Sequence, residues 1–357
     1  MNVIRKIAAL PIFHSVEIIL YHGYPVQVFH ARTDDGYILD LHRIPYGCFN
    51  NQKSRPVIFL QHGLLGSSAD WVENFPNQSF GIFSNELFWE FSWDQMAKYD
   101  LDATFDVILS ETKEKSLYYV GFSQGTLIMF AKLSQDPKFA SKIRKFFALG
   151  PVATVANVKG LFRLFATKLF PSSKLMRLFF GKKFFTLNSK LAKMIAILLC
   201  KNHFLNPLCS DVLFQIAGPG SNQFNQSRLL VYIGGEGGTS VMNMIHWMQM
   251  VNSGKMQAYN YESVKQNQLH YGRDSPPIHN VSSIDVPIYL YWSKGDWLAT
   301  AADIQKSLLS VLPNSSIKTS QEFEDYNHLD FIWGLRAPAD IYQPIISIIH
   351  KDKGKIF

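Results

Sequence analysis

The stretch Leu117–Thr126, which reads LYYVGFSQGT, constrains the fold of this chain more than any other. Its first four residues favour a strand, and the apolar run Leu127–Leu133 that follows suits a helix. A strand that turns into a helix within so few residues crowds its own backbone, so the glycines of Gly121–Gly125 avoid clashes and Ser123 is pushed outward. An ordinary strand-to-helix turn is the alternative, but this context favours a nucleophilic serine.

A serine hydroxyl is a weak nucleophile that needs a base, an acid to orient that base, and donors for an oxyanion. Strands alternating with helices predict a mostly parallel sheet, in which active-site groups gather at the carboxyl ends of the strands. Asp296 follows such a strand and a glycine, and His328 follows the last strand. The order Ser123, Asp296, His328 predicts that His328 takes the serine proton and that Asp296 orients the imidazole.

Other acids and histidines compete for these two roles. Asp303 falls within a predicted helix, whereas Asp325 and Asp330 crowd His328 in the sequence. Among the 11 histidines, His62 and His270 are the rivals of His328. His62 precedes the serine, which breaks the expected order, and a single histidine is more often structural than catalytic.

The second half of an oxyanion hole is expected after an earlier strand. Pro56–Leu60 is an unbroken apolar run, as in a buried parallel strand, and it leads into Gln61–Gly66 with the sequence QHGLLG. Glycine lets such a loop approach the active site closely. The backbone N–H groups of Leu64 and Gln124 are therefore the predicted oxyanion donors, with a plain glycine loop as the alternative.

The remaining chain supports a single α/β architecture. Asp34–Gly36 joins two β-prone runs and predicts a hairpin. The other expected elements are a short helix at Val16–Tyr21, strands at Val26–Ala31, Tyr37–Ile44, Lys145–Leu149, Pro287–Trp292 and Ser316–Thr319, and helices within Phe88–Lys113, at Ala301–Val311 and at the C-terminal end.

Composition excludes several classes of protein. The chain has 357 residues, 47% of them hydrophobic, and a net charge of +7, which does not suit an acidic disordered protein. No nucleic-acid motif accompanies the positive charge, so a surface or membrane contact is favoured and nucleic acid is not an expected partner. Met1–Phe13 resembles a shortened signal peptide, but Pro11 interrupts its short apolar stretch and no typical cleavage site follows.

The region after residue 158 changes character. Residues 159–201 contain no Asp or Glu, and phenylalanines are interleaved with ten basic residues: Lys159, Arg163, Lys168, Lys174, Arg177, Lys182, Lys183, Lys190, Lys193 and Lys201. Basic, aromatic, amphipathic segments are attracted to lipid interfaces. A helical subdomain with a solvated basic face is an equally weighted alternative.

These motifs together resemble the acid lipase family, which includes gastric and lysosomal acid lipases and has the α/β-hydrolase fold. The resemblance covers most of the chain. The matching stretches are Gly23–Pro25, Asp35–Leu39, Arg43–Tyr46, Phe59–Leu65, Asp94–Leu101, Tyr119–Thr126, Phe147–Ala153, Gly238–Val241, His246–Trp247 and Tyr326–Trp333. The QHGLL and YNHLDFIW runs among them are not generic hydrolase patterns.

The resemblance carries further expectations. It implies that Ser123, Asp296 and His328 form the triad, that Leu64 and Gln124 supply the oxyanion N–H groups, and that no cofactor or metal is required. It implies hydrolase-core segments at residues 1–152 and 281–357, separated by a helical cap and lid at 153–280. The expected substrates are neutral lipid esters at a lipid–water interface, with peripheral membrane or lipid-droplet contact, in a secreted or lysosomal protein.

Covalent modifications are also expected from the resemblance. Cys200 and Cys209, which could close a short loop in an oxidising compartment, correspond to the family's cap disulfide, and Cys48 is then left over. Four asparagines open N-x-Ser sequons and are candidate glycosylation sites: Asn77, Asn225, Asn280 and Asn314.

The chain departs from the family at two places. The family usually has histidine where Phe122 stands. Only 23 residues, with no β-prone run longer than Gly81–Phe83, separate Leu64 from Phe88, where the family has a central strand that ends in a Gly-Asn-Ser-Arg-Gly segment. Loss of that strand would deprive its neighbours of hydrogen-bond partners. The sheet must then close up, or the chain folds poorly.

Two functional hypotheses follow. The intact triad favours a serine hydrolase that cleaves carboxylic esters of lipids, such as triacylglycerols or cholesteryl esters, through an acyl-enzyme. The missing strand favours a lipid- or membrane-binding member of the family with weak or no catalysis.

Overall fold

The computed structural model describes residues 15–47, 55–72, 89–185, 213–225, 232 and 238–353. Its helices and strands follow the chain in this order: α2 (Ser15–Tyr21), β1 (Gln27–Arg32), β2 (Ile38–Arg43), β3 (Ile58–Gln61), α3 (Trp93–Gln95), α4 (Leu101–Thr112), β4 (Leu117–Phe122), α5 (Gln124–Gln135), β5 (Ile143–Leu149), α6 (Gly160–Leu164), α7 (Ser173–Phe180), β6 (Phe184–Phe185), β7 (Thr239–Ser240), α11 (Val241–Ser253), α12 (Val264–Tyr271), β8 (Ile288–Ser293), α13 (Ala301–Ile304), β9 (Ile317–Phe323), α14 (Asp330–Trp333) and α15 (Gln343–Lys353).

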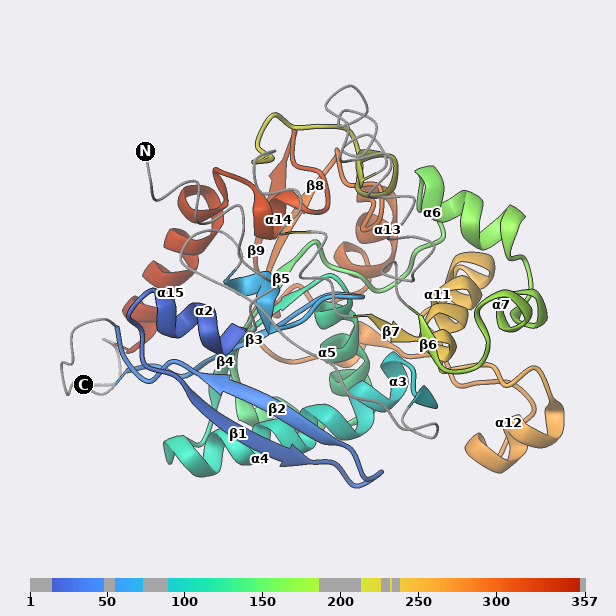
Figure 1. Cartoon of the computed structure of the whole chain (residues 1–357), viewed down its shortest axis with the longest axis horizontal. Helices are drawn as coiled ribbons and strands as arrows, with labels where there is room; N and C mark the ends of the chain where they lie inside the picture. The colour runs from blue at the N-terminus through green and yellow to red at the C-terminus, as the bar shows by residue number, and fades with distance from the viewer. Residues whose placement is uncertain are drawn as a thin grey trace.

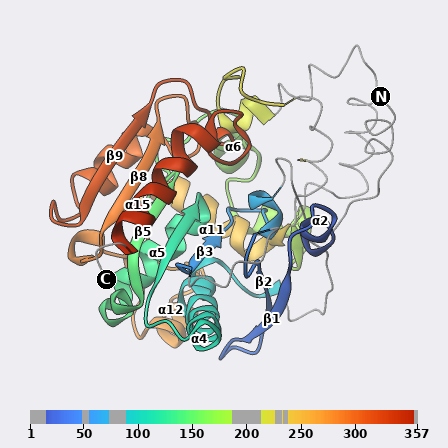
Figure 2. The same cartoon turned by 90° about the vertical axis from the view of Figure 1, so that its left-hand side faces the viewer.

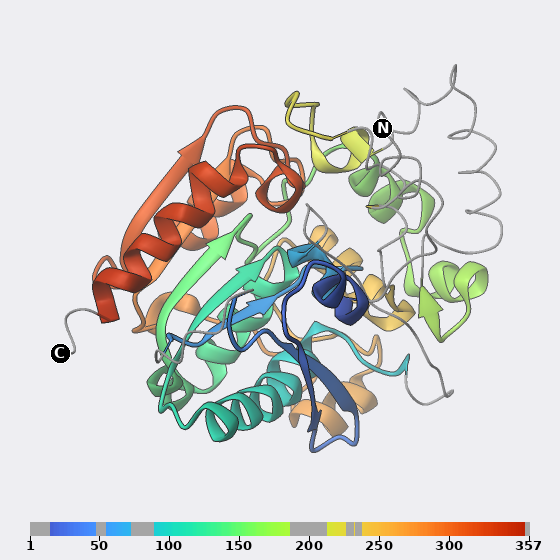
Figure 3. The ribbon, with the colours of Figure 1, turned by 60° about the vertical axis from the view of Figure 1, so that its left-hand side comes forward.

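Five parallel strands form the central sheet, in the order β3-β4-β5-β8-β9. The strand that leads to Ser123, β4, lies between β3 and β5 and is buried along its whole length. In Figure 3 the sheet twists from β3, in blue, through the green strands to the orange β8 and β9, and the red α15 lies across one face. The parallel sheet expected from the alternating pattern is confirmed, and its carboxyl ends lie on one edge.

Alternate side chains of β4 enter different hydrophobic cores on the two faces of the sheet. Leu117 and Tyr119 pack with α4, α5 and α11 on one face. Tyr118 and Val120 pack with α14 and α15 on the other. Because successive side chains of a strand point to opposite faces, a strand covered on both sides must be apolar throughout. This explains the uninterrupted hydrophobic run before Ser123.

The β1–β2 hairpin is a separate two-stranded sheet, as Figure 1 shows. β1 lies against α4, and among the described strands only β4 pairs with β3. Ile58 and Leu60 of β3 are exposed. In the part of the chain that the structure describes, the sheet has not closed up: β3 is an edge strand, and the predicted hairpin stands apart from it. The short run Gly81–Phe83 lies outside the described residues.

The described residues between β5 and β8 form helices joined by loops and the two short strands β6 and β7. The helices α6, α7, α11 and α12 gather on the right in Figure 1, and Figure 2 shows α11 and α12 behind the strands of the sheet. α11 is the longest of them, and ten of its 13 residues are buried, so it packs deeply against the sheet domain. No helix in the described ranges has the length and apolar character needed to cross a bilayer.

Candidate active site

Ser123 stands at the turn between β4 and α5 with a left-handed backbone, at φ 52° and ψ −116°. A Cβ placed on Gly121 would lie 2.8 Å from the carbonyl oxygen of Gly125. A Cβ on Gly125 would lie 2.5 Å from the carbonyl oxygen of Gln61. Both glycines are therefore required by close backbone approach, as expected, and the strained conformation of Ser123 is held by that packing.

Asp296 is fixed in the loop after β8. Its Oδ1 accepts hydrogen bonds from the backbone N–H groups of Leu298 and Ala299, both at 2.8 Å. Its Oδ2 lies 2.7 Å from Nδ1 of His328. One carboxylate oxygen is thus anchored to the loop and the other is left for the imidazole, which fixes the direction of the carboxylate.

His328 is held in the loop after β9. Its backbone N–H donates to the carbonyl oxygen of Ala217 at 3.0 Å, and the N–H of Trp297, next to Asp296, donates to the same oxygen at 3.1 Å. Nearby, the Asn327 amide and the Asp330 carboxylate accept each other's backbone N–H groups, at 3.2 and 2.7 Å. The loops carrying the acid and the base are therefore joined through one carbonyl group.

The three predicted side chains meet in one chain of hydrogen bonds. His328 Nε2 lies 2.8 Å from Ser123 Oγ, while Nδ1 faces Asp296. With the Nδ1–H tautomer, His328 donates to the carboxylate and its Nε2 accepts from the serine hydroxyl. All three residues are buried, with Asp296 only 1% exposed. The arrangement has the geometry needed to move the serine proton onto Nε2.

The two predicted oxyanion donors lie on segments that contact each other. A Cβ on Gly63 would lie 3.1 Å from the Cβ of Ser123, so the loop after β3 approaches the serine closely. Among the hydrogen bonds of the described residues, none has the backbone N–H of Leu64 or Gln124 as its donor. Both N–H groups are therefore left without an acceptor among the described residues, and they stay the predicted oxyanion donors.

A side-chain network that the sequence analysis missed holds the residue after Ser123. Gln124 Oε1 accepts from Asn243 Nδ2 at 2.9 Å and from Trp247 Nε1 at 2.7 Å, both on α11. Asn243 Oδ1 in turn accepts from the backbone N–H of Trp93 at 2.9 Å. The only signal in the sequence was that Trp247 falls in a family-like stretch. These contacts attach the helical region to the turn that carries the nucleophile.

Two buried carboxyl groups lie near the site. Burial raises the pKa of Asp70 above its usual range, although His62 and the backbone N–H of Ser67, which donates to Asp70 at 3.0 Å, act in the opposite direction. Burial likewise raises the pKa of Asp330 to about 6, against hydrogen bonds from Ser221 and from the N–H of Asn327. Both carboxyl groups are therefore protonated more easily than an exposed aspartate.

The structure gives each rival residue a different set of contacts. Asp303 bonds to Thr154, Asn157 and Thr300 in a buried cluster around α13. Asp325 forms an ion pair with Arg336, and Asp330 accepts a hydrogen bond from the backbone N–H of Asn327. His62 Nδ1 lies 2.9 Å from the carbonyl oxygen of Gly63, and His270 stacks on Tyr261 with ring centroids 3.9 Å apart. None of these residues contacts Ser123 through a described hydrogen bond.

Three predicted modification sites fall outside the described residues, namely Cys200, Cys209 and Asn77, and so does the leftover Cys48. Of the remaining sequons, Asn280 and Asn314 are exposed and Asn225 is half-buried. The described residues contain no group of His, Cys, Asp and Glu arranged to hold a metal ion.

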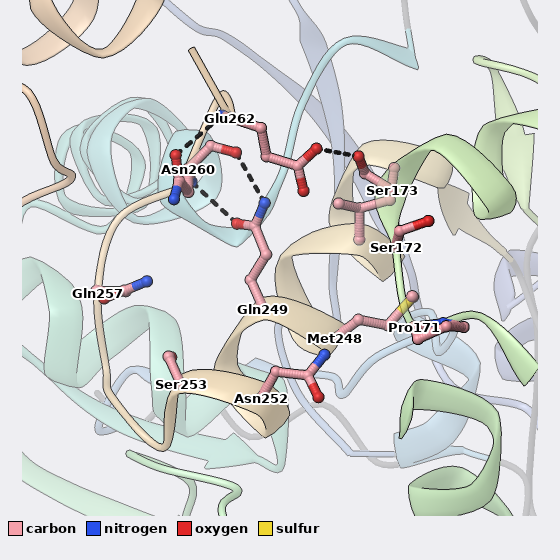
Figure 4. Close-up of a pocket in the computed structure, with 11 residues that line it drawn as sticks. Pro171, Ser172, Ser173, Met248, Gln249, Asn252, Ser253, Gln257, Asn260 and Glu262 are labelled. Atoms are coloured by element: carbon pink, nitrogen blue, oxygen red, sulfur yellow. Dashed lines mark hydrogen bonds between the residues drawn. The ribbon is translucent and has the colours of Figure 1, made fainter. Parts of the chain in front are cut away.

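A cavity of about 370 Å³ lies between α7, α11 and the loop that precedes α12. Figure 4 shows its polar lining, in which the Gln249 amide pairs with the backbone of Asn260, at 2.7 and 2.9 Å, and Glu262 accepts a hydrogen bond from Ser173. None of the three triad candidates lines it. Much of the lining hydrogen-bonds within itself, which is typical of a structural contact between helices.

Two family models match this chain. One, described as alpha/beta hydrolase fold, covers residues 56–335, and the other, described as partial alpha/beta-hydrolase lipase region, covers residues 15–75. Among solved structures, carboxylesterase CesB from Bacillus subtilis is similar with a TM-score of 0.50 and 13% identity, covering 93% of this chain and 94% of that one. Together with the sheet order, these matches confirm the predicted fold.

Curated relatives are more similar in sequence. Lipase lipl-1 of Caenorhabditis elegans is 41% identical over 370 aligned positions, which cover 94% of this chain and 91% of the relative. Gastric triacylglycerol lipase of Homo sapiens is 42% identical over 367 positions, with the same two coverages. Because both alignments are longer than the 357 residues of this chain, they contain positions at which the relative has residues and this chain has none.

Proposed function

This chain belongs to the gastric and acid lipase family of α/β hydrolases, and we propose that it cleaves carboxylic ester bonds of neutral lipids, such as triacylglycerols, through a covalent acyl-enzyme. The observation that carries the proposal is the hydrogen-bonded chain from Ser123 through His328 to Asp296. The names of the relatives support the choice of lipid esters as substrates.

In the proposed reaction, Ser123 Oγ attacks the ester carbonyl carbon while His328 Nε2 takes the hydroxyl proton. The carbonyl electron pair moves to oxygen, and this oxyanion receives hydrogen bonds from the N–H groups of Leu64 and Gln124. When the ester C–O bond breaks, His328 returns the proton to the leaving alcohol. Water then attacks the acyl-enzyme by the same steps in reverse and releases the fatty acid.

A fluorophosphonate probe tests the proposal, because it labels only a serine that a neighbouring base has activated. We expect stoichiometric labelling of the protein and none of Ser123→Ala. Ser134→Ala is a matched control, because Ser134 also lies near a histidine, with its Oγ 3.5 Å from His279 Nδ1, but it donates to the carbonyl of Ala131. Labelling that persists in Ser123→Ala would contradict the assignment. An unlabelled wild-type protein would favour the weakly catalytic, lipid-binding alternative.

We include in this proposal the division into two core segments, 1–152 and 281–357, and a cap and lid at 153–280, in a secreted or lysosomal protein. The gastric lipases among the relatives support that location. Glycosylation at the four sequons and a disulfide between Cys200 and Cys209 belong to the same proposal.

Helix α7 is the proposed contact with the lipid surface. Leu178 and Phe179 are 78% and 69% exposed, whereas Met176 of the same helix is fully buried. Lys174 and Lys182 lie close by in the sequence and are exposed. Aromatic and aliphatic side chains beside lysines suit an interface that is apolar inside and anionic at its surface.

Removing the apolar face of α7 should weaken membrane binding. We expect Leu178→Ser/Phe179→Ser to reduce co-sedimentation with phosphatidylcholine–phosphatidylserine vesicles several-fold at low salt, and Lys174→Glu/Lys182→Glu to remove the salt-dependent part of binding. Leu269→Ser on α12 is a control, because Leu269 is 75% exposed but lies outside this basic segment. If all the variants bind like the wild type, α7 is not the lipid contact.

A further inference from the structure

Phe122 is the last residue of β4 and the immediate neighbour of Ser123. Its side chain is buried, and its ring centroid lies 5.0 Å from that of His328, with 34° between the ring planes. The same ring supports the loop after β3, since a Cβ on Gly63 would lie 3.1 and 3.2 Å from two of its carbon atoms. One aromatic ring thus contacts both the candidate base and the loop that carries an oxyanion donor.

The His328 imidazole is confined by its other neighbours as well. A Cβ on Gly150, whose φ is +52°, would lie 3.1 Å from Cε1 and 3.2 Å from Nδ1 of His328. Both ring nitrogens are engaged, Nδ1 with Asp296 and Nε2 with Ser123. The Phe122 ring and the backbone of Gly150 therefore pack against the imidazole, while the hydrogen bonds define its plane.

The Phe122 ring can also interact electrostatically with His328, because His328 becomes positively charged during the reaction. When Ser123 Oγ forms its bond to the ester carbon, its proton moves to Nε2, and His328 becomes an imidazolium. The face of a phenyl ring attracts a cation within about 6 Å of its centroid, and more strongly when water is excluded. His328 is 3% exposed, so little water competes for the imidazolium.

We infer that Phe122 is a positioning residue of the reaction: its ring holds the His328 imidazole in line with Ser123 and stabilises the positive charge that this imidazole acquires. The inference rests on the proposed function, because it requires His328 to act as the base. Phenylalanine cannot itself take up a proton, unlike the histidine usual at this position in the resembled family, so it adds no second ionisation beside His328.

The charged and titratable groups around His328 come from three elements. Asp296 follows β8, Asp330 begins α14, and His62 and Asp70 belong to the segment after β3 that packs on Phe122. β5 contributes Gly150, and β4 contributes Phe122 and Ser123. A substitution at Phe122 leaves all four titratable groups in the chain, so it changes the ring without removing a charge.

The test is the pH dependence of kcat/KM for a soluble short-chain ester. His328 must be neutral to accept the proton, so activity falls when His328 is protonated. Phe122→Leu removes the ring face at similar volume, which destabilises the imidazolium form of His328 relative to the neutral imidazole. We expect the acidic limb of the profile to move to lower pH by about half a unit to one unit, with a plateau several-fold lower. Phe122→Tyr keeps the aromatic ring face, so the acidic limb of its pH profile should stay at the wild-type position.

A matched control separates this effect from lost packing. Phe147 on β5 is fully buried in the same hydrophobic core as Phe122, so Phe147→Leu should lower the melting temperature without moving the acidic limb. If Phe122→Leu does not fold, Phe122→Met supplies the same measurement with a flexible side chain. An acidic limb that stays at the wild-type pH in the folded variant overturns the inference, even if the rate falls. Failure of the proposed function is distinct, because the wild type would then show no phosphonate labelling.

Discussion

Replacing Asp296 by asparagine is expected to reduce ester turnover by about four orders of magnitude, while Ser123→Ala or His328→Ala abolishes it. The asparagine can keep the hydrogen bonds from Leu298 and Ala299 through its Oδ1. Its amide nitrogen then faces Nδ1 of the imidazole, so His328 must adopt the tautomer with the proton on Nε2. In that tautomer Nε2 cannot accept the serine proton. Steady-state turnover of a soluble ester, measured with the folded variant, checks the expectation.

Asp303→Asn is the matched control for this substitution. Asp303 is another buried acid with several hydrogen bonds, 2% exposed, but it bonds to Thr154, Asn157 and Thr300. Its replacement should change the melting temperature more than turnover. If Asp296→Asn retains most of the wild-type turnover, another group orients His328 and the assignment of the acid is wrong.

Gly125→Ala should be a strongly damaging substitution, because the one methyl group that it adds has no space. The new Cβ would lie 2.5 Å from the carbonyl oxygen of Gln61 and 2.9 Å from that of His62, and both are backbone atoms that cannot rotate away. The segment leading to Leu64 must then shift, and a displaced oxyanion donor costs roughly 10²- to 10³-fold in turnover. We expect a fall of this size in kcat, together with a lower melting temperature.

Gly47→Ala provides the comparison, because a Cβ at Gly47 meets no atom within 4 Å and its backbone is not left-handed. Its turnover and melting temperature should stay close to those of the wild type. Wild-type kcat in Gly125→Ala would mean that the loop after β3 can move without loss, and that Leu64 is not a donor in the reaction.

The parts of the molecule that local sequence determines were predictable. The β4–Ser123–α5 turn depends on neighbouring residues, and the apolar runs before Gln61 and Lys294 identify β3 and β8 as strands of the parallel sheet. The expected burial of the first run was wrong, because β3 lies at the edge of the sheet and exposes Ile58 and Leu60. The order of Ser123, Asp296 and His328 was enough to predict which side chains meet, since all three follow parallel strands of one sheet.

Contacts between distant segments were not predictable in the same way. The bond from Asn243 to Gln124 spans 119 residues, and neither side chain belongs to a pattern that specifies the other. The contact between Phe122 and His328 likewise depends on how β4 and the loop after β9 are placed together. The sequence indicated that a strand was missing, but only the pairing of the described strands shows that β3 is at the edge of their sheet and that the β1–β2 hairpin is separate from it.

That edge has an evolutionary consequence. Every strand that precedes a triad residue belongs to the continuous block β4-β5-β8-β9, and each of them keeps its hydrogen-bonded neighbours within the central sheet. A deletion in the coding sequence between β3 and α3 removes residues that lie outside this block of strands. Such a deletion leaves the strands that precede the triad residues paired, and it reaches the chemistry through the neighbouring loop that carries Leu64. A strand beyond β3 could therefore be lost or gained in evolution while β4 and Ser123 keep their places in the sheet.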